Sequence, residues 1–302
     1  SLAESDLQFG LMHAEYFAGI AKYDFGGVVL PTKDENRFLG LGIIRFAIDD
    51  IPNTLYLIDP DGSVNYNNVT SFSAADYAFI FSYSQNTKIE GLRVGANFKT
   101  VHRSLGSFAS SWGFGLDFGA QYDMGDMKLG LMARDITTTF NAWSFNFTDS
   151  EKEVLVATGN EIPDNSLELT MPKFIIGFSY DFYIKDKMRI RPAINIDLTT
   201  DGKRNVLLSA DPISLDPHFG FEFAYSEVVY LRGGINNIQR STDNVLDDEI
   251  LLVQPNFGLG LKIKSVNIDY ALTNVGESTK SLFSHIFSLS VNINKKIASV
   301  EE

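Results

Sequence analysis

The chain has 302 residues, a formal net charge of −13 at pH 7 and no cysteine. The lack of cysteine excludes disulfides and thiolate metal sites, and the acidic balance argues against a nucleic-acid partner, whose phosphates would be repelled. No run of about eighteen apolar residues occurs, which excludes a membrane-spanning helix but not membrane-spanning strands.

Alternation of apolar and polar residues with a period of two predicts β-strands along most of the chain. In 88–101 and 111–123, apolar residues alternate with glycine and with charged residues such as Lys99 and Asp117. In chain order, we predict fourteen strands over residues 6–13, 16–25, 37–48, 72–84, 88–101, 111–123, 127–135, 172–184, 187–198, 217–226, 228–235, 255–264, 265–272 and 283–294.

The polar face of these strands decides the fold class. It carries Arg93, Lys99 and Asp117, which the core of a soluble protein would accept only with many buried partners. The strands are also about twice as long as those of soluble sheets and reach the length needed to cross a bilayer at a tilt. We therefore predict an all-β fold, a single closed antiparallel transmembrane barrel over 1–302, with its apolar face toward lipid. A soluble two-sheet protein is the alternative.

The connections between the predicted strands support the barrel. Those that follow even-numbered strands are short, such as Gly125-Asp126 and Lys264-Ser265, whereas several that follow odd-numbered strands are long, such as 136–171. Tight turns in the periplasm and longer loops outside are typical of barrels in the bacterial outer membrane. Many strand glycines are expected on the lumen face, where they leave room inside and ease curvature: Gly95, Gly113, Gly115, Gly119, Gly130, Gly177, Gly258 and Gly260.

An aromatic cluster in the longest predicted outer loop is the main candidate site. It contains Phe140, Trp143, Phe145 and Phe147. Exposed aromatic side chains at such a position need a partner, so we predict that these four residues form part of a protein-docking surface. An aromatic girdle at the membrane boundary, or a loop folded over the lumen, is the alternative.

Enzymatic and metal chemistry are disfavoured. His102 beside Arg103 and Ser104 is the only arrangement that resembles a nucleophile and its base, and neighbours on a strand point to opposite faces. His218 and Glu222 share one strand face, but a pair without a third ligand is weak evidence for a metal. We predict no catalytic residues, no metal site and no cofactor.

Several short segments resemble one known family, the PorV/PorQ outer-membrane proteins of Bacteroidota, which are distantly similar to the FadL fatty-acid channels. The resemblance covers most of the chain and lies in strand-and-turn motifs: His13-Ala14-Glu15-Tyr16, Tyr23-Asp24-Phe25, Asp50-Ile51-Pro52-Asn53-Thr54, Asp59-Pro60-Asp61-Gly62, Phe72-Ser73-Ala74-Ala75-Asp76, Ile268-Asp269-Tyr270-Ala271 and His285-Ile286-Phe287-Ser288-Leu289.

This resemblance implies a non-enzymatic, FadL-like barrel of about fourteen strands that serves type IX protein secretion. Its partners would be outer-membrane lipid, other subunits of a secretion or assembly complex, and secreted cargo proteins bound through their C-terminal signal domains. The glycine-rich, plug-like segment that usually precedes the first strand in this family is not seen before Ser1. The alternative is a FadL-like transporter of hydrophobic small molecules.

Overall fold

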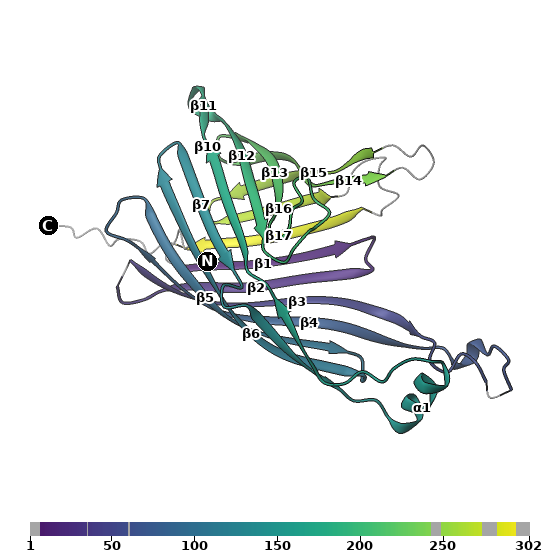
Figure 1. The fold of residues 1–302 in the computed structure, drawn as a ribbon. Coiled ribbons are helices and arrows are strands. Elements are labelled where there is room, and N and C mark those ends of the chain that lie inside the picture. Colours follow the sequence, from purple (N-terminus) through teal and green to yellow (C-terminus); the bar gives the residue numbers. More distant parts are fainter. Residues whose placement is uncertain (1–6, 35, 60, 243–248, 274–282, 294–302) are drawn as a thin grey trace.

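The computed structural model describes residues 7–34, 36–59, 61–242, 249–273 and 283–293. The described strands form one antiparallel sheet (Figure 1). They are β1 (Leu7–Tyr16), β2 (Ala21–Pro31), β3 (Arg37–Asn53), β4 (Thr70–Asn86), β5 (Leu92–Leu105), β6 (Ala109–Met124), β7 (Met127–Arg134), β8 (Thr139–Phe145), β9 (Ser166–Thr170), β10 (Lys173–Tyr180), β11 (Phe182–Ile184), β12 (Met188–Thr199), β13 (Ser214–Tyr225), β14 (Val229–Thr242), β15 (Glu249–Ile263), β16 (Val266–Thr273) and β17 (Ser284–Ile293).

The sheet closes because β1 pairs with both β2 and β17. Two of the barrel strands are interrupted: β8 continues β7 along β6, and β9, β10 and β11 together form the next strand. The wall is therefore a closed barrel of fourteen antiparallel strands, as predicted. The described residues between these strands form one short α-helix, α1 (Asp149–Ala157), and two 3-10 turns, η1 (Tyr66–Asn68) and η2 (Lys185–Lys187).

The outer face of the barrel is apolar, as the alternation predicts. On β15, Phe257, Leu259 and Ile263 each expose more than half of their surface, at 57%, 55% and 53%. Leu39 and Leu41 on β3 do the same at 54% each. A continuous band of large exposed apolar side chains over neighbouring strands matches a hydrocarbon environment, so this face lies against lipid.

One sector of the outer face is polar. His13 Nδ1 lies 2.7 Å from Asp24 Oδ1, and Arg45 Nη1 donates to Asp24 Oδ2 at 3.2 Å. These three residues are cross-strand neighbours on β1, β2 and β3, and Lys22 pairs with Asp49 next to them. We call these five residues the outer polar row. The row limits how far lipid reaches up this side of the wall.

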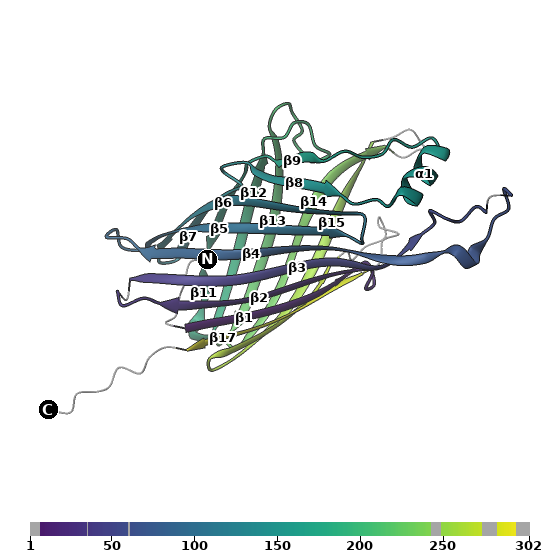
Figure 2. The same cartoon turned by 90° about the horizontal axis from the view of Figure 1, so that it is seen from below.

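The strands are longer than predicted at the end that carries the loops. β3 extends to Asn53 and β14 to Thr242, so less of the chain is loop, and the excursion after β3 projects furthest (Figure 2). The first hairpin was predicted wrongly: its turn lies at 17–20 rather than at Ala14-Glu15, and β2 occupies most of the predicted loop 26–36. Phe17 and Ala18 adopt positive φ there, which their residue types do not indicate.

Neither the α-helix nor the 3-10 turns of the described part are long and apolar enough to cross a membrane. Residues 1–6 lie outside the described residues. The single-domain organisation over 1–302 stays a prediction.

Candidate lumenal site

A cavity of about 540 Å³ lies against the lumen wall formed by β5, β6, β7, β10 and β12. Its lining includes Gly119, Gly130 and Gly177 together with the apolar Met132 and Ile175. Asparagine, glutamine and serine side chains, together with the charged Lys128 and Arg191, add hydrogen-bonding groups to this largely apolar surface. Its volume falls within the range of about 300–1,000 Å³ that is typical of small-molecule sites.

Glycine creates this space. A Cβ added to Gly130 would meet no atom within 4 Å, and one added to Gly119 would meet its nearest atom at 3.8 Å. The neighbouring Gly113 and Gly115 serve another purpose, since a Cβ there would lie 2.2 Å from the carbonyl oxygen of Phe140 and 1.8 Å from Thr139 Oγ1. Some lumen glycines therefore leave room, and others let two parts of the wall approach closely.

A buried charged cluster lies on the inner face beside the interruption between β7 and β8. Lys99 Nζ donates to Asp117 Oδ1 at 2.8 Å and lies 2.5 Å from Asp135 Oδ1. The Asp135 amide donates to Asp117 at 2.9 Å, and the Thr139 hydroxyl donates to Asp135. All four residues are less than 10% exposed. The cluster holds residues 134–139 folded inward, with Asp135 and Thr138 at positive φ.

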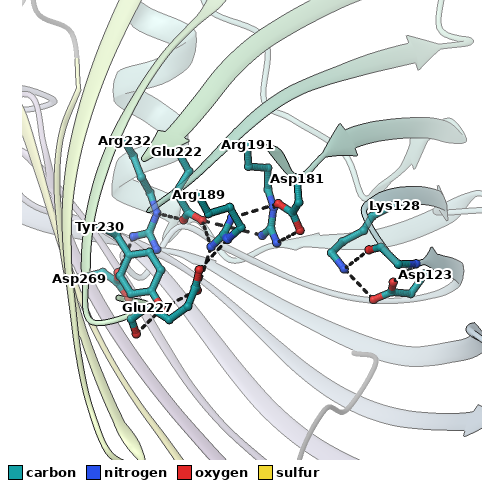
Figure 3. A network of polar contacts seen from close by, with 11 residues as sticks. Asp123, Lys128, Asp181, Arg189, Arg191, Glu222, Glu227, Tyr230, Arg232 and Asp269 are labelled. Atoms are coloured by element: carbon teal, nitrogen blue, oxygen red, sulfur yellow. Dashed lines mark hydrogen bonds and ion pairs between the residues drawn. The ribbon is translucent and has the colours of Figure 1, made fainter. Parts of the chain in front are cut away.

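A second network of charged side chains lines the lumen at the end of the barrel where short turns connect the strands (Figure 3). Arg189 donates to Asp181, Glu222 and Glu227 at 2.8–3.2 Å, and Arg191 donates to Asp181 Oδ2 at 2.7 Å. Arg232 extends it by donating to Glu222 Oε2 at 2.7 Å and to Asp269 Oδ1 at 2.5 Å. These contacts join β12, β13, β14 and β16 across one side of the barrel mouth.

The network has one member in a turn, Glu227, between β13 and β14. Hydrogen bonds from the Arg189 guanidinium lower the pKa of the Glu227 carboxyl below its usual range. The carboxylate therefore stays ionised in mildly acidic solution, and this contact persists there. Sequence reasoning missed the network, although Arg189 and Arg191 occupy alternate positions of one strand, which is a readable signal of a polar lumen face.

The aromatic cluster predicted in a loop is largely a strand. Phe140, Trp143 and Phe145 belong to β8, which pairs with β6 and β9, and Phe147 follows its end. Trp143 lies opposite Ser111, on the same inner face as Asp117. Phe140 lies opposite Phe114 on the outer face, with ring centroids 5.1 Å apart.

The inner aromatic row consists of Trp143, Phe145, Phe147 and Phe108. Consecutive ring centroids along this row are 6.4, 6.3 and 5.8 Å apart. Trp143 Nε1 donates to Glu168 Oε2 at 2.8 Å, and the Arg103 guanidinium lies over the indole ring, 5.1 Å from its centroid. The row leads along the inside of the wall beyond the apolar band. Phe140 is not part of it.

The structure gives the histidines considered from the sequence other partners than those weighed there. His102 stacks on Trp112 with centroids 4.4 Å apart, and its Nδ1 lies 3.1 Å from the backbone oxygen of Ser111. Glu222 is held by arginines, while His218 Nε2 lies 3.3 Å from Asp216 Oδ2. Within the described residues, no group of three or more histidine or carboxylate side chains is arranged to hold a metal ion.

No protein-family model and no curated protein matches this chain. Among solved structures, it is similar to the Pseudomonas putida toluene transporter TodX, with a TM-score of 0.55 at 12% identity, covering 96% of this chain and 90% of TodX. The Ralstonia pickettii toluene transporter TbuX gives a TM-score of 0.55 at 13% identity and coverages of 97% and 90%. The monoaromatic hydrocarbon channel CymD gives 0.52 at 12% identity and coverages of 97% and 90%.

At such identities the likeness concerns the fold. It confirms the predicted closed antiparallel barrel, and a barrel of this kind with a lipid-facing exterior lies in the bacterial outer membrane. The matched proteins are transporters and channels rather than enzymes. None of these three comes from a type IX secretion system, so the PorV/PorQ resemblance gains no support from them. The short motifs that carried it are strand-and-turn signatures that specify a barrel wall rather than its cargo.

Proposed function

We propose that the protein is a channel that lets small hydrophobic molecules cross the outer membrane. The observation that carries this proposal is the glycine-lined cavity of about 540 Å³ within the lumen. Its apolar walls match a hydrophobic solute, and the amide and hydroxyl groups among them suit a molecule with one polar group. The fold shared with hydrocarbon channels supports the same class of substrate.

The inner aromatic row supplies an access path from outside. Trp143, Phe145 and Phe147 turn toward the inside of the wall, so a hydrophobic molecule that contacts them is led along the inner surface toward the lumen. A docking surface for secreted cargo would instead need these rings on the outside, where Phe140 alone points. The orientation of the row therefore favours the channel over the secretion role.

The test blocks the cavity with one side chain. Gly130→Phe adds a ring where a Cβ meets nothing within 4 Å, so it fills the cavity without displacing the wall. In intact bacterial cells that produce the protein, we expect uptake of the hydrophobic dye 1-N-phenylnaphthylamine to exceed that of cells without it. Gly130→Phe should return uptake most of the way to the level without the protein.

Gly26→Phe is the matched control. A Cβ at Gly26 lies at ordinary contact distances from Leu11 and Ile43, 3.6 and 3.7 Å away, which face the lipid. The same phenylalanine is thus added to the outside of the barrel, and uptake should stay at the wild-type level. Wild-type uptake in the Gly130→Phe protein, or no uptake through the native protein, would refute the channel.

A further inference from the structure

The excursion between β3 and β4 ends in an ordered hairpin, which we call the tip (residues 54–59 and 61–69). Ile58 and Val64 form an antiparallel bridge, and Asn65 caps η1 by accepting from the Asn67 amide at 3.1 Å. Asn65 and Asn68 donate to the two oxygens of Asp59 at 2.8 and 2.9 Å. The tip is therefore held in one conformation by its own hydrogen bonds.

This ordered tip presents apolar side chains to its surroundings. Ile58 is 62% exposed, Val64 57% and Tyr66 77%. Because Ile58 and Val64 are bridge partners, their side chains lie side by side. Apolar groups gathered on a preformed hairpin outside the core mark a binding surface more often than single exposed residues do.

Lipid does not reach the tip. The outer polar row includes Arg45, and the tip begins nine residues later in the chain, directly after β3 ends at Asn53. At a rise of about 3.3 Å per residue, and with a bulge between Ile48 and Ile51, this separation amounts to somewhat less than about 30 Å. In both views the excursion extends beyond the barrel on the side where α1 lies (Figures 1 and 2). The apolar patch is therefore in the aqueous phase.

The tip and the segment that it contacts are both acidic. The segment 54–69 contains Asp59 and Asp61 and no basic residue, and the adjacent segment 146–165 contains five acidic residues and one lysine. The two segments touch, since Tyr56 Oη donates to Ser150 Oγ at 3.2 Å. Hydrogen bonds from Ser63 lower the pKa of Asp61, so this charge persists in mild acid.

The negative charge of the tip and of the segment beside it determines which kind of partner can bind there. An anionic lipid headgroup would be repelled, and a second copy of the chain would bring an equally acidic tip. A cationic surface with apolar side chains satisfies both the charge and the exposed patch. We propose that the tip is a docking site for a protein segment that carries lysine or arginine residues around an apolar face. This site is separate from the proposed channel and does not depend on it.

The test uses two synthetic peptides as probes, one of alternating leucine and lysine and one of alternating leucine and glutamate. Their binding to the full-length barrel in phosphatidylcholine nanodiscs is measured by fluorescence anisotropy, with binding to empty discs subtracted. The lysine peptide should bind at least tenfold more tightly than the glutamate peptide. Replacing two exposed apolar side chains in Ile58→Ser/Tyr66→Ser should weaken its binding about tenfold or more.

Two further variants test the contribution of the acidic charges and the dependence of binding on the tip. Glu153→Gln/Glu161→Gln/Asp164→Asn removes three charges from the segment that contacts the tip and should weaken lysine-peptide binding severalfold. Leu208→Ser changes an exposed apolar residue (56% exposed) in the loop after β12 and should leave it unchanged. Equal binding of both peptides, unchanged binding to the Ile58→Ser/Tyr66→Ser variant, or tip-dependent self-association of the barrel would each overturn the proposal.

Discussion

Lys99 shows how a single residue can hold the wall where a strand is interrupted. Its ammonium group pairs with both Asp117 and Asp135, in a site from which water is nearly excluded. Sequence alternation correctly placed Lys99 and Asp117 on the inner face. It gave no sign of Asp135, which reaches them only because residues 134–139 fold inward at two positive φ angles.

Removing this lysine should be costly. Lys99→Met leaves two buried carboxylates without their cation, and we expect a loss of about 3–5 kcal/mol in the free energy of unfolding. Urea unfolding of the barrel in detergent micelles, followed by tryptophan fluorescence, measures it.

Lys22→Met is the control, because Lys22 pairs with Asp49 at 3.0 Å on the outer face with both side chains more than a third exposed. That substitution should cost less than about 1 kcal/mol. If both variants lost the same free energy of unfolding, burial of the Lys99 cluster would contribute nothing to the stability of the barrel.

At the scale of the element, β6 shows how glycine lets a strand pair with a neighbouring strand that is interrupted and folds inward. It pairs with β7 over one half and with β8 over the other. The close approach falls at Gly113 and Gly115, where any side chain would overlap β8. Because residues 135–138 break the alternation, β8 was mistaken for a loop, although the residues from Trp143 to Phe147 keep a period of two.

Gly113→Ala should therefore loosen β8. The added methyl group would lie 2.2 Å from the backbone carbonyl oxygen of Phe140, which cannot move aside as the end of a flexible side chain could. Overpacking of this kind costs about 1–3 kcal/mol. Hydrogen exchange of the β8 amides should become faster. Gly130→Ala adds the same group in open space and should stay within about 0.5 kcal/mol of wild type. Unchanged exchange in Gly113→Ala would contradict the close approach.

For the whole molecule, the sequence was sufficient to predict the strand number, the closure and the lipid-facing side. These follow from long, regular alternation, which each strand repeats independently. The aromatic row could not be oriented in this way. The alternation of β8 changes phase between Ala142 and Trp143, so its aromatic residues pass from the outer face at Phe140 to the inner face at Trp143 and Phe145.

Substitutions of two neighbouring residues of β17 test whether the apolar face of the wall lies against lipid and the polar face lines the lumen. Leu289 is on the lipid face, 39% exposed, and Ser288 lines a lumen cavity. Leu289→Lys should destabilise the folded barrel in lipid vesicles by about 2–4 kcal/mol if it lies near the bilayer midplane. Ser288→Lys places the same charge in the lumen and should cost less than about 1 kcal/mol. Denaturant titration in vesicles compares them, and the reverse order would exclude a lipid-facing exterior.

The outer polar row has a consequence for how the protein sits in its membrane. On β3 the apolar residues that face outward run from Leu39 to Ile43, about 13 Å along the strand, before Arg45 ends them. On β15 they run from Leu251 to Ile263, about 40 Å. An apolar band of such uneven height creates hydrophobic mismatch on the side of β1, β2 and β3. The barrel therefore tilts in the membrane, or the outer leaflet becomes thinner beside these strands.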